Sequence, residues 1–493
     1  MELVKETGRS NPFDDFAIRI HRYVLRIKAR DSFDVQKHNL EEWGSSVASL
    51  GSKYRSVAVI GTGPSGLSAV RALSDENAFD TIRVFERRDR IGGVWIYDPK
   101  PEPFPSPVSK RPSTLQLPSK LPAFTQPAGE DPGARTGIYD TLDSNVGQKI
   151  MAFTHTPFPE VNSAQSTERY GANNPTRPWK VVAGYIEDGF KDYRHLLSLN
   201  TTVERVEKVG DDWTLTLRKS DETYRGHSND YWWQERFDAV VVATGHYTVP
   251  YIPAIWGIDE AYKALPHKFE HSKFFRSPDD YVGKKVVVVG GNVSAGDLVA
   301  DLSPIVKGPL YISQRGRNEA LSAVFAFDGV VTKPQIKRIS ADHGGIVEFE
   351  DGSTVENFDK IIFATGYRLS YPFLNPDPVT PQNRLSGFYQ HIFKIGDPSL
   401  SVIGQVKAAL SFRVYEYQAV AVARFLAGRA KLPKYFNFLR DLAGKPASGT
   451  KAYELPAWED KWAELGFAVL ALKDKYWKSL KKAKEDGPIR AKL

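Results

Sequence analysis

The hydrophobic pattern is most regular just after residue 55, where apolar runs and a helical repeat follow one another. An apolar run over Val57–Ile60 predicts a buried strand. A helix is predicted directly after it by apolar residues at helical spacing, Leu67, Val70 and Leu73. A second apolar run, Ile82–Phe85, then ends in Glu86. The pattern therefore predicts a strand, a tight turn, a helix and a strand, which is the opening unit of an α/β fold.

The turn between this strand and helix has glycine at the three positions of a dinucleotide-binding loop. Gly61 permits the turn, Gly63 lets backbone NH groups approach a pyrophosphate, and Gly66 allows close packing of the helix. Glu86 stands twenty residues after Gly66, the spacing at which an acid is expected to bind a ribose hydroxyl. A glycine turn in another kind of α/β unit is the alternative, and the complete context argues against it. The predicted nucleotide-binding residues are Gly61, Thr62, Gly63, Pro64, Ser65, Gly66 and Glu86.

A second strand, turn and helix begins at Lys285–Val289. Its three glycine positions hold Gly290, Asn292 and Ala295. The third position tolerates alanine, and asparagine is the least costly substitute for glycine if the middle position requires a positive φ. Asn292 nevertheless brings a side chain to the place where a pyrophosphate approaches.

The strand after this second helix, Leu310–Ser313, leads into arginines instead of an acid. Arg315 and Arg317 occupy the region that Glu86 occupies in the first unit, and arginine there accommodates a 2′-phosphate. NADPH is therefore the predicted second nucleotide. Solvated surface arginines are the alternative, since surface arginine is common.

Two further buried strands end in the same Ala-Thr-Gly sequence, and they bracket the second loop. They span Ala239–Gly245 and Asp359–Gly366. This arrangement predicts one nucleotide domain nested inside another. Other patterns predict strands at Thr202–Val206 and Trp213–Leu217, a hairpin of Ile346–Glu350 with Thr354–Val355, an irregular surface loop over Pro99–Pro132, and helices over Glu416–Leu426 and Trp458–Leu480.

Residues 1–50 precede the first strand and contain one predicted amphipathic helix. Asn11 and Pro12 make a good helix start, and the helix sets an apolar face against arginines. We interpret it as an arm docked on its own chain or on a neighbouring subunit. A basic helix lying on a membrane surface is the alternative.

The absence of cysteine among 493 residues narrows the chemistry most. It excludes the redox pair of disulfide-reductase flavoproteins, thiolate zinc sites and structural disulfides, and we predict no metal site. The net charge of +7 suits anionic dinucleotides but is not gathered into a stripe, so we expect no nucleic-acid partner. No apolar run reaches the length of a membrane span and the N-terminus is charged, so we expect a soluble, intracellular protein.

Taken together, these motifs resemble those of the flavin-containing monooxygenases over roughly residues 55–430. GTGPSG is similar to the family's FAD loop, GGVW (92–95) to its flavin-side tryptophan motif, and GNVSAGD (291–297) to its NADPH loop. YDTLDSN followed by IMAF (139–153) resembles the segment with the catalytic asparagine. ATGYRLSYPFL (364–374) resembles the signature that closes the inserted domain.

The sequence departs from the family pattern in the identifying motif and in the NADPH loop, and residues 1–50 and the proline-rich loop have no counterpart in the compact members. His271 and Phe275 fit the family's identifying motif, but its phenylalanine and glycine are replaced. Phe275 is followed by Arg276 and not by the Trp-Pro of Baeyer–Villiger enzymes. Asn292 replaces the usual glycine of the NADPH loop.

The resemblance implies an α/β fold with two Rossmann-like dinucleotide-binding domains, the NADPH domain being inserted into the FAD domain. The implied segments are an N-terminal helical extension (1–50), the FAD domain in two parts (51–247 and 359–493, the second with C-terminal helices) and the NADPH domain (248–358). Asn145 is implied as the catalytic residue. Further implied cofactor-binding residues are Val94, Trp95, Ser144 and Asn145, and, for NADPH, Gly290, Asn292, Ser294, Ala295, Gly296, Asp297 and Arg315.

The implied enzyme is an N,N-dimethylaniline-type monooxygenase with FAD and NADPH as cofactors. NADPH would reduce the flavin, O2 would add at C4a, and the hydroperoxide would oxygenate a small soft nucleophile, an amine nitrogen or a thioether sulfur. Because the cofactor supplies the chemistry, no acid and base pair is required. His155, His246 and His271 therefore receive no catalytic role. The alternatives are a Baeyer–Villiger monooxygenase acting on a ketone and a nucleotide-binding protein without turnover.

The chain ends in Ala491, Lys492 and Leu493, close to a peroxisomal targeting address. We expect a cytoplasmic protein, with the peroxisome as the alternative. The sequence leaves open the identity of the substrate and whether the chain forms a homodimer.

Overall fold

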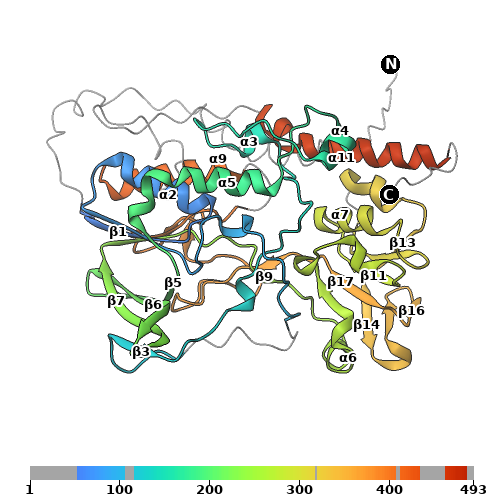
Figure 1. Ribbon diagram of the computed structural model, residues 1–493, viewed down its shortest axis with the longest axis horizontal. Helices are drawn as coiled ribbons and strands as arrows, with labels where there is room; N and C mark the ends of the chain where they lie inside the picture. The colour runs from blue at the N-terminus through green and yellow to red at the C-terminus, as the bar shows by residue number, and fades with distance from the viewer. Residues whose placement is uncertain (1–52, 106–115, 317–318, 407–410, 433–460, 486–493) are drawn as a thin grey trace, which may run out of the picture.

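The structure is a computed structural model in which two nucleotide-binding units lie side by side (Figure 1). It describes residues 53–105, 116–316, 319–406, 411–432 and 461–485. The helix predicted within residues 1–50, Arg317 and the last three residues therefore lie outside the described residues.

The first unit is built on a seven-stranded sheet that contains β1 (Ser56–Ile60). β1 pairs in parallel with β2 (Thr81–Phe85) on one side and with β8 (Ala239–Val242) on the other. Both faces of β1 are covered, which explains why its sequence is a continuous apolar run instead of an alternation. The other strands of this sheet are β4 (Leu197–Ser198), β19 (Phe388–Tyr389), β20 (Phe393–Lys394) and β21 (Leu400–Val402).

Helices cover one face of the first sheet, and a group of antiparallel strands covers the other (Figure 1). α2 (Pro64–Glu76) packs on α9 (Ser411–Leu426), and α5 (Trp179–Gly189) contacts α2. Val59 of β1 joins the core under these helices, whereas its neighbour Ile60 joins the core under the antiparallel strands. The alternation of side chains along one strand thus fills two cores.

The antiparallel strands form a four-stranded sheet, which the sequence indicates only in part. The predicted strands at 202–206 and 213–217 are confirmed as the middles of two longer ones. The other two are not indicated by the sequence, and one of them interrupts the predicted irregular loop over 99–132. In sheet order the strands are β3 (Ala123–Thr125), β7 (His227–Phe237), β6 (Asp212–Tyr224) and β5 (Thr201–Val209).

The second unit has a five-stranded parallel sheet and a three-stranded antiparallel one. The parallel strands, in sheet order, are β10 (Phe269–His271), β17 (Lys360–Phe363), β11 (Val286–Val289), β12 (Leu310–Ser313) and β13 (Val330–Lys333). The antiparallel strands are β14 (Ile336–Ser340), β15 (Ile346–Phe349) and β16 (Thr354–Glu356), and β15 with β16 confirms the predicted hairpin. The helices of this unit include α6 (Ile258–Ala264), α7 (Val293–Leu302) and α8 (Ser322–Phe325).

The boundary predicted at residue 358 is wrong, because β17 lies beyond it and belongs to the second sheet. β17 pairs in parallel with β11 along its whole length. The chain crosses between the units at β9 (Val249–Pro250) and β18 (Tyr367–Arg368), which pair with each other. The inserted unit therefore runs from β9 to β18, and the two Ala-Thr-Gly strands belong to different sheets.

The last described helix, α11 (Lys461–Glu485), runs across the second unit, whereas the sequence suggests a helix of the first (Figure 1). It contacts α8 of the second unit and two short helices near residue 145, α3 (Gln148–Met151) and α4 (Ala164–Tyr170). Among the α11 side chains whose burial is described, Val469 and Trp477 are buried. Across all the described segments, no helix combines the length and the apolar character that crossing a bilayer requires.

Candidate functional site

The first glycine loop, between β1 and α2, leaves no room for side chains at its first and third positions. Gly61 has φ +107°, and a Cβ there would lie 2.7 Å from the carbonyl oxygen of Ala243 at the end of β8. A Cβ on Gly66 would lie 2.0 Å from the carbonyl oxygen of Gly61. Both glycines are therefore required by contacts within the protein, as predicted for the turn and for close helix packing.

The middle position, Gly63, faces a second pair of glycines. A Cβ on Gly93 would lie 2.8 Å from the Cα of Gly63, whereas a Cβ on Gly63 would make only ordinary contact, 3.5 Å from the Cα of Gly93. No side chain caps the N-terminus of α2. Two chains of bare backbone and an uncapped helix start fit the pyrophosphate of a dinucleotide.

Glu86 closes the first loop at the end of β2. Its Oε2 accepts hydrogen bonds from the backbone N–H (3.0 Å) and the hydroxyl (2.8 Å) of Thr62, and its Oε1 accepts one from the backbone N–H of Arg88 (3.0 Å). Each carboxylate oxygen can accept more than one hydrogen bond, so Glu86 can still bind a ribose hydroxyl. The structure thus adds a role in holding the loop to the predicted one.

The second loop repeats this geometry at its first position only. Gly290 has φ +143°, and a Cβ there would lie 2.4 Å from the carbonyl oxygen of Ala364 at the end of β17. Asn292 has φ −120°, so the middle position does not require a positive φ and asparagine is not needed there for that reason. Its side chain accepts a hydrogen bond from the backbone N–H of Val293 (2.9 Å), and Asn292 is thus the N-cap of α7.

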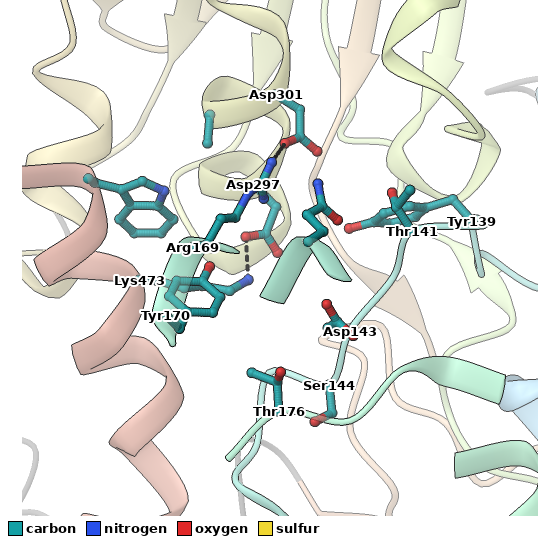
Figure 2. Close-up of a pocket in the computed structure, with 13 residues that line it drawn as sticks. Tyr139, Thr141, Asp143, Ser144, Arg169, Tyr170, Thr176, Asp297, Asp301 and Lys473 are labelled. Carbon is teal, nitrogen blue, oxygen red and sulfur yellow. Dashed lines mark hydrogen bonds and ion pairs between the residues drawn. The ribbon is translucent and has the colours of Figure 1, made fainter. Parts of the chain in front are cut away.

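Only some of the predicted NADPH-binding residues are exposed near the second glycine loop. Asn292 and Ser294 are exposed at the start of α7, and Arg315 is exposed just after β12. Gly296 and Asp297 are turned toward the C-terminal helix α11 instead. A Cβ on Gly296 would lie 3.7 Å from the ring of Trp477, and the carboxylate of Asp297 pairs with Lys473 (Figure 2). The contacts described for Gly296 and Asp297 are thus with the protein, and their role at the NADPH site stays a prediction.

Asn145 lies exposed on a tight turn, and its neighbour Ser144 is buried. The hydroxyl of Ser144 donates to the carbonyl oxygen of Val146 (3.0 Å) and accepts from the backbone N–H of Arg177 (3.0 Å). The hydroxyl of Ser144 thus shapes the turn, and its cofactor contact stays a prediction. Asn145 is left as the side chain that the turn presents to solvent.

A second segment, residues 174–179, holds this turn in place. Besides its contact with Ser144, Arg177 is 2% exposed, and its guanidinium donates to the side-chain oxygen of Gln148. The backbone N–H of Gln148 donates to the carbonyl oxygen of Pro175 (2.9 Å), and that of Trp179 donates to Leu142 (3.0 Å). The Asn145 turn is therefore rigid. The sequence does not indicate Arg177, because its contacts join segments thirty residues apart.

Trp179 links the segment of the Asn145 turn to the segment of the tryptophan motif. The ring of Trp179 stacks on that of Tyr97, with centroids 5.2 Å apart, and its Nε1 donates to the carbonyl oxygen of Asp140 (3.0 Å). Trp95, two residues before Tyr97, is half-buried against the core under α2, and Val94 is likewise half-buried. The segments that the resemblance assigns to the flavin side are thus brought together.

Buried polar residues tie the two crossings between the units. His271 is fully buried, its Nε2 donates to the carbonyl oxygen of Gly366 (2.9 Å), and its Nδ1 accepts from the backbone N–H of Lys273 (3.1 Å). Burial lowers the pKa of His271 to about 3, so it is neutral. The ammonium of Lys273 donates to Glu102 (2.8 Å) and to the carbonyl oxygen of Thr248 (2.6 Å). Burial raises the pKa of Glu102 to about 7 against the opposing effect of Lys273.

Comparison with known families and proteins agrees with this geometry. A family model described as flavin-binding monooxygenase-like matches residues 122–326 and 317–459, and an NAD(P)-binding Rossmann-like model matches residues 59–124. The flavin-containing monooxygenase FMO GS-OX5 of Arabidopsis thaliana is 31% identical over 394 residues, 78% of this chain and 77% of that protein. The chain belongs to the flavin-containing monooxygenase family.

Other members of this family resemble the chain to a similar extent. The monooxygenase iboF of the fungus Amanita muscaria is 30% identical over 440 residues, 76% of this chain and 79% of its own length. The solved structure of S-allyl-L-cysteine S-oxygenase from Allium sativum superimposes with a TM-score of 0.60 at 27% identity and covers 90% of this chain and 85% of that one. As a flavin-containing monooxygenase, the chain takes FAD and NADPH as cofactors.

Proposed function

We propose that this flavin-containing monooxygenase uses NADPH and O2 to oxygenate a soft heteroatom, a thioether sulfur or an amine nitrogen. The name of the Allium sativum protein describes an S-oxygenase, and its similarity over most of the chain supports sulfur as the first candidate. Bound FAD would supply the oxygen-transfer chemistry after reduction by NADPH. The protein itself would bind and orient the cofactors and the substrate, and would exclude water from the site.

The observation that carries the proposal is the Asn145 turn, an exposed neutral amide on a rigid support. Arg177 and Ser144 hold the turn through hydrogen bonds with each other. These hydrogen bonds do not involve the Asn145 side chain. An amide can donate and accept hydrogen bonds without titrating, which a carboxylate or an imidazole cannot do at neutral pH. Asn145 is thus suited to orient bound groups next to the flavin while adding no stray proton.

The glycine loops would hold the two cofactors. The bare backbone of Gly63 and Gly93 would receive the pyrophosphate of FAD at the open N-terminus of α2, and Glu86 would bind its ribose. Asn292 and Ser294 at the start of α7, with Arg315 for the 2′-phosphate, would receive NADPH. These residues supply binding and orientation only.

The test is a matched panel of a thioether, a tertiary amine and a ketone given to the purified, FAD-loaded protein. We expect NADPH consumption with formation of a sulfoxide or an N-oxide. An ester formed from the ketone would instead support a Baeyer–Villiger enzyme. Binding of FAD and NADP+ without NADPH consumption on any of the three would support a nucleotide-binding protein without turnover.

The Baeyer–Villiger alternative is not favoured by the residues after Phe275. Arg276 stands where those enzymes have tryptophan, and its guanidinium donates to backbone carbonyl oxygens, including those of Asp98 (2.8 Å) and Thr136 (2.9 Å). Arg276 therefore serves to join the loop before residue 137 to the second unit. Its contacts are structural.

A further inference from the structure

A polar cluster lies between α7 of the second unit, α4, α11 and the segment that leads to Asn145 (Figure 2). The proposed chemistry uses none of its charged groups. Its charged members come from each of these four elements: Asp143, Arg169, Asp297, Asp301 and Lys473. The cluster thus joins the NADPH unit to the turn that presents the proposed catalytic residue.

α11 touches the Asn145 turn directly. Gly147, two residues after Asn145, has an ordinary extended backbone (φ −65°). A Cβ on Gly147 would nevertheless lie 2.9 Å from the carbonyl oxygen of Leu465 in the first part of α11. Contact with this helix, and not backbone strain, therefore makes glycine necessary at this position.

The same helix is fixed to α7 about two turns later. Lys473 pairs with Asp297, and both side chains are mostly shielded from solvent, at 12% and 25% exposed. Trp477 is buried in the core of the second unit, and its ring lies close to α7, where a Cβ on Gly296 would be 3.7 Å away. One rigid helix therefore contacts the Asn145 turn near Leu465 and the NADPH-loop helix near Lys473 and Trp477.

α4 makes a second connection between the same two places. The hydroxyl of Ser163, the N-cap of α4, donates to the carboxylate of Asp143 (2.6 Å). At the other end of α4, the guanidinium of Arg169 donates to Asp301 (3.4 Å) on α7 and lies 5.7 Å from the ring centroid of Tyr476 on α11. The two connections brace each other.

We propose that α11, braced by α4, is a strut that sets the position of the NADPH loop relative to Asn145, with Lys473 as a positioning residue. Asp297 starts the second turn of α7, so a shift at this pair moves the start of the helix and the Asn292 loop with it. Residues along such a network change coupling by about 0.5 to 2 kcal/mol, which is about two- to thirtyfold in an equilibrium. This proposal rests on the proposed function, because that function assigns the catalytic role to Asn145. The contacts of α11 are observed independently of it.

The test compares Lys473→Met, which keeps the length of the side chain but not its charge, with Lys478→Met on the same helix. Lys478 is 67% exposed and pairs with Asp474 one turn away on the same helix, so it is a matched control. We expect Lys473→Met to weaken NADP+ binding about two- to thirtyfold and to lower the ratio of oxygenated product to NADPH consumed, with normal FAD content. Lys478→Met should leave both unchanged. Equal NADP+ affinity in the two variants would overturn the proposal.

A charge exchange separates positioning from packing. Lys473→Asp combined with Asp297→Lys should restore most of the NADP+ affinity that Lys473→Met loses, because the pair is kept with reversed sign. A double variant no better than the single one would contradict the strut. NADP+ affinity is measured without turnover, so this arm stands even if no substrate is oxygenated and the proposed function fails.

A steric variant tests the other end of the helix. Gly147→Ala places a methyl group against the backbone of α11 without backbone strain, and Gly184→Ala on α5, where a Cβ meets open space, is its control. We expect Gly147→Ala to weaken NADP+ binding from a position on the Asn145 side. A fall in melting temperature with unchanged NADP+ affinity in both Gly147→Ala and Lys473→Met would reduce α11 to a packing element.

Discussion

The two glycine loops have the same strand-turn-helix arrangement, but they differ in how closely the surrounding backbone packs against each of their three glycine positions. In both, the first glycine backs onto the alanine of an Ala-Thr-Gly strand end, Gly61 on Ala243 and Gly290 on Ala364. The middle position then differs, because the first loop leaves α2 uncapped and the second caps α7 with its own Asn292. The first position is thus dictated by the protein, while the middle one is free to vary with the nucleotide.

The third position and the following acid extend this contrast. Gly66 allows no Cβ against the carbonyl oxygen of Gly61, whereas Ala295 fits fully buried in the second loop. Glu86 holds the first loop through Thr62, and the exposed Arg315 follows the second. The proposed FAD loop is thus closed by contacts within its own unit, and the proposed NADPH loop is more open.

The largest expected effect is at the shared first position. Gly61→Ala and Gly290→Ala each combine a positive φ with a collision against a backbone carbonyl, so each should cost about 3 kcal/mol or more of folding free energy. Gly61→Ala should lose FAD, and Gly290→Ala should lose NADP+ binding while keeping FAD. Thermal unfolding and flavin absorbance measure both.

The matched control is Gly308→Ala, which has φ +72° but open space around a Cβ. It should cost only about 1 kcal/mol, for the backbone conformation alone. Equal effects at Gly308 and Gly61 would mean that the close approach to the strand ends does not matter.

The middle position should separate the loops most clearly. Gly63→Val should abolish FAD binding, because its side chain would stand where the pyrophosphate is proposed to bind, and Gly63→Ala should weaken it while the apoprotein still folds, because a Cβ there makes only ordinary contact with the protein. Asn292→Gly should keep NADP+ binding and lose a few tenths of a kcal/mol of stability with its cap. Full flavin content in Gly63→Val, measured by absorbance, would show that the loop is misassigned.

The charge after the second loop should set the choice of nicotinamide cofactor. Arg315→Ala should weaken NADPH binding about ten- to hundredfold and leave NADH binding nearly unchanged, because a charge-assisted contact with the 2′-phosphate is lost. Steady-state KM values for the two cofactors give the answer. An unaltered preference would move the assignment to Arg317.

The folding stability of the second unit should also depend on pH through His271, which lies at the end of β10. Its pKa is about 3 in the folded protein and near 6.5 when unfolded, so the unfolded state binds the extra proton between these values. The contribution of His271 to stability should therefore fall as the pH falls from 6.5, by at most about 1.4 kcal/mol per pH unit. Denaturant unfolding at pH 7 and pH 5 measures this loss, and His271→Asn should lack that part of it. An equal loss in both proteins would exclude His271 as the cause.

Local sequence was sufficient to predict the loops because their constraints are local. The spacing of Gly61, Gly63 and Gly66 and the acid at Glu86 all sit within one strand-turn-helix unit, and the structure has them in that arrangement. The positions of Gly296 and Asp297 were not predictable in this way. Their partners, Trp477 and Lys473, come from a helix more than 170 residues away.

The same difference between local and long-range contacts explains which parts of the fold the sequence does not predict. The boundary at residue 358 failed because the apolar run of β17 fits either sheet, and only its pairing with β11 decides between them. β7 was not indicated because its sequence, HSNDYWWQERF, mixes polar and aromatic residues on a hairpin that is partly exposed. Ser144 and Arg177 shape the Asn145 turn through contacts that only the folded chain brings together.

The most direct test of the account is the ratio of oxygenated product to NADPH consumed in Asn145→Leu, measured with a thioether on protein of normal FAD content. We expect this ratio to fall close to zero while FAD stays bound, with any remaining NADPH oxidation yielding hydrogen peroxide. Asn145→Asp should fail as well, because a carboxylate cannot donate a hydrogen bond. A variant with lower thermal stability but an unchanged ratio would show that Asn145 only shapes its turn, and would contradict the account.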